Sequence, residues 1–123
     1  MTAAVASFPS KVGEQMSQVT RTKKEPSPEV LVEAAETFAM LASPQRLRLL
    51  WLLSHDECDV STLAATLGVS SPLVSQHLAK MRLAGLVSAR RHGKRQFYTV
   101  DDPHVVSLVD QAIDHHEDLR NRS

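Results

Sequence analysis

Apolar side chains recur along this chain at spacings of three and four residues, and this pattern predicts a mainly helical protein. Ser-Pro pairs at 27–28 and 43–44 precede the first two apolar stretches. Each pair predicts the start of a helix, because serine caps a helix and proline fits its first turn. The first predicted helix runs to Leu41. The second contains Trp51, which the pattern places in the core or at a subunit interface.

The middle of the chain carries the pattern of a helix-turn-helix. Asp59 is predicted to cap a third helix that closes at Gly68. Ser71 is predicted to cap a fourth helix, with Pro72 in its first turn. Gly85 should end that helix, because glycine accepts the left-handed conformation found there. The short link between the third and fourth helices then forms the turn of the motif.

A basic β-hairpin is predicted to follow the fourth helix. Residues 86–90 and 96–100 are its expected strands, around a turn at His92-Gly93. Between Val60 and Val100 the sequence has no Asp or Glu, against these cations: Lys80, Arg82, Arg90, Arg91, Lys94 and Arg95. The predicted fold is therefore mainly α with a small β-hairpin, a winged helix-turn-helix. Its basic face suits a polyanion such as double-stranded DNA better than a membrane.

Length, net charge and cysteine content narrow the class further. The 123 residues fit one domain, 28–119, between a flexible N-terminal tail, 1–27, and a short tail, 120–123. The formal net charge is zero, so the basic face arises because positive and negative residues lie in different parts of the chain, and not from an excess of positive residues. The single cysteine excludes an internal disulfide and favours a reducing cytoplasm. No apolar run approaches the length of a membrane span, so we expect a cytoplasmic protein with no membrane partner.

Two stretches, LASPQRLRLLWLL and STLAATLGVSSPLVSQHLAKMRLAGLVSARRHGKRQFYTVDDPHV, resemble the ArsR/SmtB family of bacterial metalloregulatory repressors. The resemblance covers roughly residues 29–119. It implies a homodimer that holds operator DNA without metal and releases the DNA when metal binds. It also implies a regulator rather than an enzyme.

Position in the helix-turn-helix indicates which side chains would read DNA. The N-terminal, solvent-facing residues of a recognition helix meet the major groove. Here these are Ser71, Ser75, Gln76 and His77, with Lys80 further along. Gln76 is the best candidate for a base contact, because its amide can pair bidentately with adenine. The wing residues expected to contact phosphates or the minor groove are Arg90, Arg91, Lys94 and Arg95.

The last predicted helix, capped by Asp102, carries two pairs of metal-capable residues. Asp102 and His104 stand at its start, and His115 and Asp118 stand near its end. The histidines are about 16 Å apart along one helix at 1.5 Å per residue, too far to share an ion. If two copies pack antiparallel about a two-fold axis, the start of one helix meets the end of the other, twice per dimer.

These four residues also match the pattern Asp-x-His…His-x-x-Glu/His of the C-terminal metal site in the resembled family. Asp118 stands where Glu or His is usual, and His116 or Glu117 remains an alternative fourth ligand. Two imidazoles and two carboxylates suit tetrahedral Zn(II) and can accept Co(II). The family's thiolate site needs a pair of cysteines, whereas Cys58 is alone.

The sequence thus predicts a metal-responsive transcriptional repressor that binds operator DNA as a homodimer and is released on binding Zn(II) between subunits. The alternative is a winged-helix DNA-binding regulator controlled by another metal (Co or Ni), by redox state or by a small molecule. A metallo-hydrolase is disfavoured, because four protein ligands would close the coordination shell of the zinc.

Overall fold

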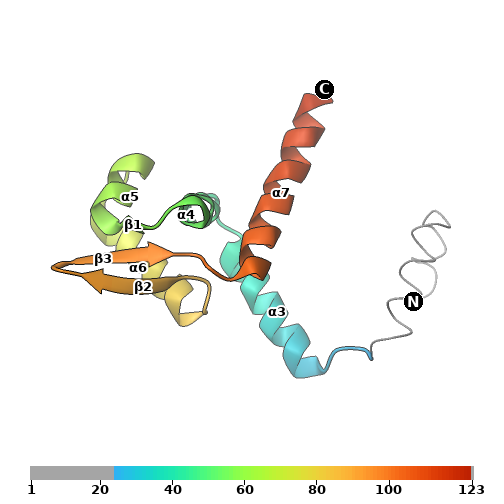
Figure 1. Cartoon of the computed structure of the whole chain (residues 1–123). Coiled ribbons are helices and arrows are strands. Elements are labelled where there is room, and N and C mark those ends of the chain that lie inside the picture. Colours follow the sequence, from blue (N-terminus) through green and yellow to red (C-terminus); the bar gives the residue numbers. More distant parts are fainter. Residues whose placement is uncertain (1–23, 123) are drawn as a thin grey trace. The chain divides into compact units, whose positions relative to one another are not determined.

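The computed structural model describes residues 24–122, and its elements follow the predicted order (Figure 1). They are α3 (Pro28–Leu41), α4 (Pro44–His55), β1 (Cys58–Asp59), α5 (Val60–Leu67), α6 (Ser71–Leu83), β2 (Ser88–His92), β3 (Arg95–Thr99) and α7 (Pro103–Asn121). The chain divides into two compact units at Ala35/Glu36, within α3, and all later elements belong to the second unit. The mainly helical class with a small β-hairpin is confirmed. Most of the predicted tail, 1–27, lies outside the described residues.

Local signals set the ends of α4 and α5 where the sequence predicts them. The hydroxyl oxygen of Ser43 accepts the N–H of Arg46 at 3.3 Å, and the Asp59 carboxylate accepts the N–H of Thr62 at 3.0 Å. At the other end of α5, Gly68 has a φ of 71°, in the left-handed region. Each helix therefore begins or ends on a side chain or glycine that satisfies the unpaired backbone groups at its terminus.

The cap of α6 is Ser70, so the prediction of Ser71 was wrong by one residue. Ser70 is extended and its hydroxyl accepts the N–H of Leu73 at 3.3 Å, whereas Ser71 is already helical. The sequence offers two adjacent serines, and Pro72 fits either choice because proline is accepted throughout the first helical turn. The pattern alone could not separate the two.

The C-terminal end of α6 confirms the predicted role of Gly85. Gly85 has a φ of 78° and donates its N–H to the carbonyl of Arg82 at 3.0 Å. The next N–H, that of Leu86, reaches back to the carbonyl of Met81 at 2.9 Å. This pair of bonds is a Schellman motif, and the buried side chains of Leu86 and Met81 provide the apolar contact that accompanies it.

The hairpin turn lies one residue later than predicted. His92 pairs with Arg95, so the two loop residues are Gly93 and Lys94, with Gly93 at a φ of 64°. A two-residue hairpin needs a left-handed residue within the loop itself, and Gly93 is the residue that supplies it. The strand before the turn also begins later than predicted, at Ser88. Residues 86 and 87, which were predicted to open this strand, are buried in the core ahead of it.

A third strand, β1, was not predicted. It spans only Cys58–Asp59 and pairs antiparallel with β3, which gives a sheet in the order β1-β3-β2. Cys58 pairs with Tyr98 and Asp59 with Phe97. A segment of two residues is too short to show the alternation of apolar and polar positions that predicts a strand. The consequence is that the wing is anchored along one edge to the segment that leads into α5.

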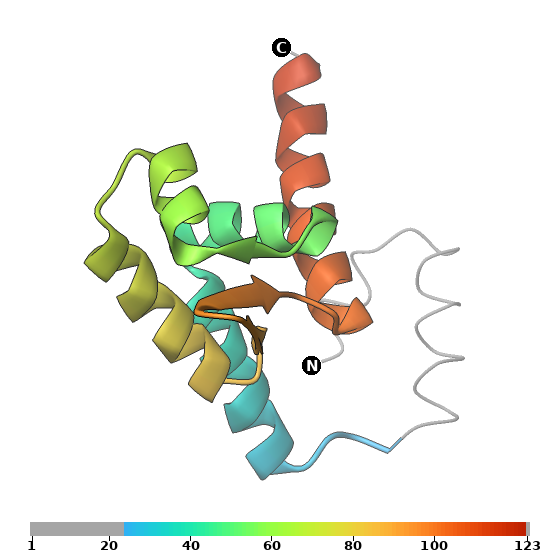
Figure 2. The same cartoon turned by 60° about the vertical axis from the view of Figure 1, so that its left-hand side comes forward.

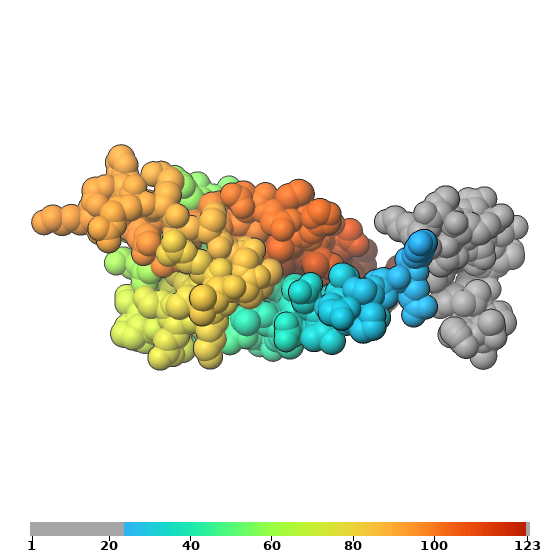
Figure 3. Space-filling view, turned by 90° about the horizontal axis from the view of Figure 1, so that it is seen from below, coloured from blue at the N-terminus to red at the C-terminus, as the bar shows by residue number. Residues whose placement is uncertain are grey.

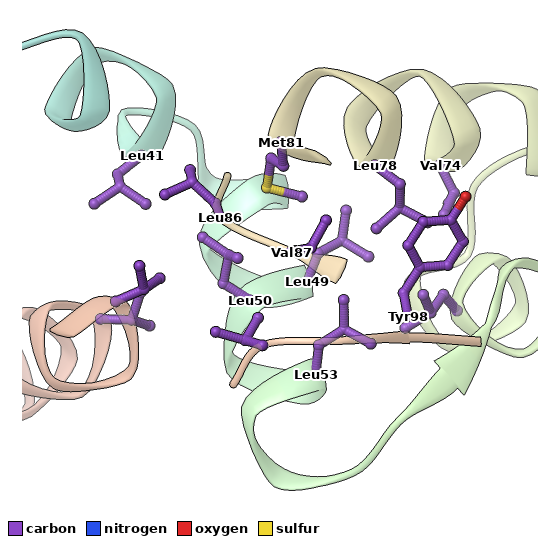
Figure 4. Close-up of a cluster of buried hydrophobic side chains, with 14 of the residues drawn as sticks. Leu41, Leu49, Leu50, Leu53, Val74, Leu78, Met81, Leu86, Val87 and Tyr98 are labelled. Carbon is purple, nitrogen blue, oxygen red and sulfur yellow. The ribbon is translucent and has the colours of Figure 1, made fainter. Parts of the chain in front are cut away.

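The core of the second unit lies where α4, α5, α6 and the sheet converge (Figure 2). Figure 4 shows the leucines of α4 facing the buried side of α6, with Tyr98 of β3 beside them. The side chains that are less than 2% exposed are Leu49, Leu50, Leu53, Leu63, Val74, Leu78, Met81 and Val109. Helix α7 packs against α4, away from α6.

One prediction of the sequence pattern needs adjustment at the C-terminal end of the domain. Helix α7 continues to Asn121, so the first two residues of the predicted tail at 120–123 are helical. The apolar side chains of α3 are largely exposed, with Leu31 at 51% and Phe38 at 58%, whereas Leu41 is buried. No helix among residues 24–122 is long and apolar enough to cross a membrane.

Candidate nucleic-acid interface and metal-binding helix

Helix α6 separates its polar and apolar residues on two faces. One face is buried, through Val74, Leu78 and Met81. The predicted DNA-reading residues on the exposed part of the helix are Ser71, Ser75, Gln76 and Lys80. Figure 3 shows α6, in yellow, and the wing, in orange, at the same end of the second unit. The arrangement leaves a polar helix and a basic hairpin open to one large ligand.

His77 occupies a different environment from its neighbours on α6. Its ring is half-buried between α6 and α4, where Nδ1 accepts the N–H of Arg46 Nε at 3.2 Å. The other ring nitrogen, Nε2, lies 3.0 Å from Oε1 of Gln45 and donates to it in the neutral tautomer that the Arg46 bond requires. Burial, followed by the nearby cations Arg46 and Lys80, lowers the pKa of His77. This geometry makes His77 a link between α6 and α4, with both ring nitrogens engaged.

We expect the stability of the domain to fall as the pH is lowered through this titration. The pKa of His77 is below its ordinary value of 6.5, so the folded state binds the proton less well than the unfolded state. The stabilisation is fully present above about pH 6.5 and is lost as the pH falls through the lowered pKa. Urea unfolding midpoints of the wild type and of His77→Gln, measured at about pH 7.5 and 5.5, test this expectation. Equal losses in the two proteins would contradict it.

The four predicted wing cations are not equivalent. Arg90 forms a two-point ion pair with Glu57, in which Nε donates to Oε2 at 2.9 Å and Nη2 donates to Oε1. This hydrogen bonding is the main reason why the pKa of Glu57 lies below its usual range. Arg95 lies 3.5 Å from the buried carboxylate of Asp59. Arg91 and Lys94 are exposed near the turn.

Helix α7 carries all four predicted metal ligands. Asp102 caps the helix, and one of its oxygens accepts the backbone N–H of His104 at 2.8 Å and lies 3.2 Å from Nδ1 of the same residue. The backbone hydrogen bond is the main cause of the lowered pKa of Asp102. His115 and Asp118 stand in exposed positions three residues apart, which puts them on one side of the helix.

The structure therefore brings the predicted ligands together as two separate pairs. The helix is continuous over Pro103–Asn121, so the separation of about 16 Å between the histidines along its axis applies. Among residues 24–122, no three His, Cys, Asp or Glu side chains are grouped as a metal would require. His116, an alternative ligand, contacts the ring of His115 with ring centres 5.0 Å apart.

A groove of about 360 Å³ separates α4 from α7. Its apolar lining includes Leu47, Trp51 and Ile113, and its polar lining includes Arg48, Asp114 and Glu117. Trp51 is 40% exposed, so its predicted place in the core is wrong, and the interface role remains a prediction. Helix α4, which carries Trp51, and helix α7, which carries the metal-capable residues, thus meet at a surface with exposed apolar atoms.

Nothing in the local sequence around His77 and Arg90 indicates their partners. Gln45 and Arg46 lie more than thirty residues before His77, and Glu57 lies 33 residues before Arg90. One signal was present but not used: Glu57 and Asp59 are the last acids before the acid-free stretch. Acids at such a boundary are well placed to pair with the first cations that fold back onto them.

The class of the protein follows from these elements. Helices α5 and α6 with their tight link form a helix-turn-helix, and β2 with β3 forms its wing. Among solved structures, the chain is similar to the homodimeric winged helix-turn-helix DNA-binding domain Mb0332 from Mycobacterium bovis, with a TM-score of 0.67 and 28% identity. That similarity covers 77% of this chain and 91% of the Mb0332 chain.

Sequence comparisons identify the family. A family model described as "Bacterial regulatory protein, arsR family" matches residues 43–89. The HTH-type transcriptional regulator NmtR of Mycobacterium tuberculosis is 38% identical over 87 residues, which are 71% of this chain and 72% of NmtR. The chain belongs to the arsR family of bacterial regulatory proteins. The predicted resemblance is thereby confirmed, and the relatives that the chain matches are regulators rather than enzymes.

The match to another regulator covers less of that protein's length. The HTH-type transcriptional regulator KmtR of Mycobacterium tuberculosis is 46% identical over 78 residues, which are 63% of this chain but 60% of KmtR. The chain thus spans less than two thirds of the length of this relative.

Proposed function

We propose that this chain is a metal-responsive transcriptional repressor that binds operator DNA as a homodimer and is released when Zn(II) binds between the subunits. The observation that carries the proposal is the exposed polar face of α6 beside an acid-free, basic wing, in a chain of the arsR family. The expected site of action is the cytoplasm.

The DNA-binding part of the proposal assigns residues by exposure. Major-groove contacts fall to Gln76 and its exposed neighbours Ser71, Ser75 and Lys80. Phosphate contacts fall to Arg91 and Lys94, which are exposed and lie at the end of the wing. His77 is left out of the contact set, because its ring is engaged by Arg46 and Gln45.

The homodimer is supported by apolar surface that one chain leaves uncovered. Helix α3 exposes Val30, Leu31, Val32 and Phe38, each by more than half. Exposed apolar surface that is contiguous along one element is typical of a protein interface. The Mb0332 domain, which this chain resembles, is described as homodimeric.

The metal site would use one pair of residues from each subunit. Asp102 and His104 of one protomer would be joined by His115 of the partner subunit and Asp118 of the partner subunit. The donor set fits zinc: each pair already stands at one end of α7, and two imidazoles with two carboxylates complete a tetrahedral shell. Bound zinc would supply a cross-link between subunits whose strength depends on metal concentration.

Other effectors have weaker support on this chain. Two relatives are named for resistance to cadmium and to mercury, which supports a metal effector without naming this one. Thiophilic metals prefer thiolates, and the chain has one cysteine. Burial raises the pKa of the Cys58 thiol, so little reactive thiolate forms at neutral pH. Cobalt and nickel remain the competing metals for an N/O site.

We expect Gln76→Ala to lower the discrimination between operator and mixed-sequence DNA by about 1–3 kcal/mol, because a bidentate base contact is lost. Operator DNA can be obtained by selecting tight-binding duplexes from a random library with the full chain. Gln111→Ala is the matched control, since the Gln111 amide donates to Ser107 within α7. If the Gln76 variant keeps its discrimination, α6 does not read bases through this residue.

A further inference from the structure

The ion pair between Arg90 and Glu57 crosses the whole sheet. Glu57 directly precedes β1, Arg90 lies on β2, and β3 runs between them. Arg90 pairs across β2 and β3 with Phe97, which itself pairs with Asp59 of β1. Side chains directly opposite one another in a sheet share a face, and so do residues two apart on a strand. Glu57, Arg90 and Phe97 therefore share one face.

The Phe97 ring completes the setting of Arg90. The Arg90 guanidinium carbon lies 5.3 Å from the centre of the ring, a cation–π distance. The carboxylate of Glu57 takes two of the guanidinium N–H groups. A planar guanidinium held by a two-point carboxylate and an aromatic face has a fixed direction, which a single-point surface pair would not give.

The face that holds Arg90 is turned away from α6. Tyr98, one residue from Phe97 on β3, points the opposite way and is buried with the residues of α6 (Figure 4). Ala89 pairs with Tyr98, and alternation along β2 then places Arg91 on the same face as Tyr98. Neighbouring arginines of the wing thus project from opposite faces, and Arg91 is the one on the side of α6.

We propose that Glu57 is a positioning residue that withholds Arg90 from DNA, so that the wing presents Arg91 and Lys94 to the phosphates and the sequence-independent part of the affinity stays low. The inference rests on the DNA binding proposed above. Phosphate contacts hold specific and non-specific complexes alike, so a withheld cation lowers both affinities and leaves base reading intact. Glu57 thus reduces the number of wing cations that can contact phosphates, although the sequence retains all of them.

The test is the salt dependence of binding to a mixed-sequence duplex and to the selected operator, between about 50 and 200 mM salt. Arg91→Ala should make the slope of log K against log salt shallower by about 0.9, the value of one phosphate contact. Arg90→Ala should leave the slope unchanged. Glu57→Gln should steepen it by about 0.9 on both duplexes, because the released Arg90 gains a phosphate.

Two further variants separate the proposal from simple charge effects. Asp56→Asn removes the same charge one residue away from Glu57, at an exposed position, and should change the slope less than Glu57→Gln does. Glu57→Gln combined with Arg90→Ala should return the slope to the wild-type value. Urea unfolding of each variant checks that the domain remains folded.

The results that overturn the proposal are distinct from failure of DNA binding. If Arg90→Ala flattens the slope as Arg91→Ala does, Arg90 contacts phosphate despite Glu57. If Glu57→Gln and Asp56→Asn give equal slopes, the ion pair has no positioning role. A wild-type chain that binds neither duplex at low salt would instead refute the proposed function.

Discussion

Addition of Zn(II) to the operator-bound protein is expected to weaken DNA binding by about 5–150-fold, equivalent to a coupling free energy of 1–3 kcal/mol. The reason is that the proposed ligands lie on α7, apart from α6 and the wing, so metal can act only by favouring one arrangement of the two subunits. Linkage requires that operator DNA weaken zinc binding by the same factor. Zinc affinity measured with and without saturating operator tests both directions. Equal values would remove the metal switch and leave a DNA-binding protein with another control.

Substitution of the proposed ligands makes the zinc experiment specific. Removal of a residue that merely orients a ligand costs about 10–100-fold in metal affinity, so His104→Ala and His115→Ala should each cost at least that much. His55→Ala is the control, because His55 lies on α4 and its ring bonds to the Trp51 carbonyl at 2.7 Å. Comparison of Asp118→Ala with His116→Ala and Glu117→Ala identifies the fourth ligand. Unchanged zinc affinity in both histidine variants would place the metal elsewhere.

Leu78→Ala is expected to destabilise the domain by about 2–5 kcal/mol, a large share of the 5–15 kcal/mol that holds a typical domain together. Leu78 is fully buried, and Figure 4 places it between the leucines of α4 and the ring of Tyr98. Its truncation therefore leaves a cavity in the part of the core that positions α6. Chemical unfolding monitored by far-UV circular dichroism measures the loss.

The same helix supplies a matched control for this substitution. Leu83 is 91% exposed at the end of α6, so Leu83→Ala should change stability by no more than about 0.5 kcal/mol. The two variants delete the same atoms from the same helix and differ only in burial. A comparable loss in both would mean that Leu83 is covered, for example by a second subunit, and would revise the surface assigned to α6.

The features predicted correctly from sequence are those set by short-range chemistry. Ser43, Asp59, Gly68 and Gly85 each act on backbone groups within a few residues, so their spacing from the apolar pattern was sufficient to locate the helix ends. The predicted position of the wing's turn was wrong by one residue, also for a local reason. His92 is compatible with both strand and turn, and the pairing of the two strands decides between them.

The features that sequence could not give depend on contacts between distant segments. His77 looks like a solvent-facing residue on its own helix, and its role changes only when α4 brings Arg46 and Gln45 to it. Strand β1 exists because β3 folds back beside it. Arg90 and Arg91 are adjacent arginines that the sequence alone does not distinguish. Strand alternation places their side chains on opposite faces of the sheet, and Glu57 holds that of Arg90.

The exposed indole at the groove between α4 and α7 gives the protein a built-in optical reporter. Trp51 is the one tryptophan in the sequence, and its ring is tilted by 41° against that of His55, with 4.2 Å between the ring centres. Excitation of tryptophan therefore samples a single environment, beside the helix that carries the proposed metal ligands. The emission wavelength of the unlabelled chain reads out solvent access at that groove, with no dye to perturb the surfaces on either side.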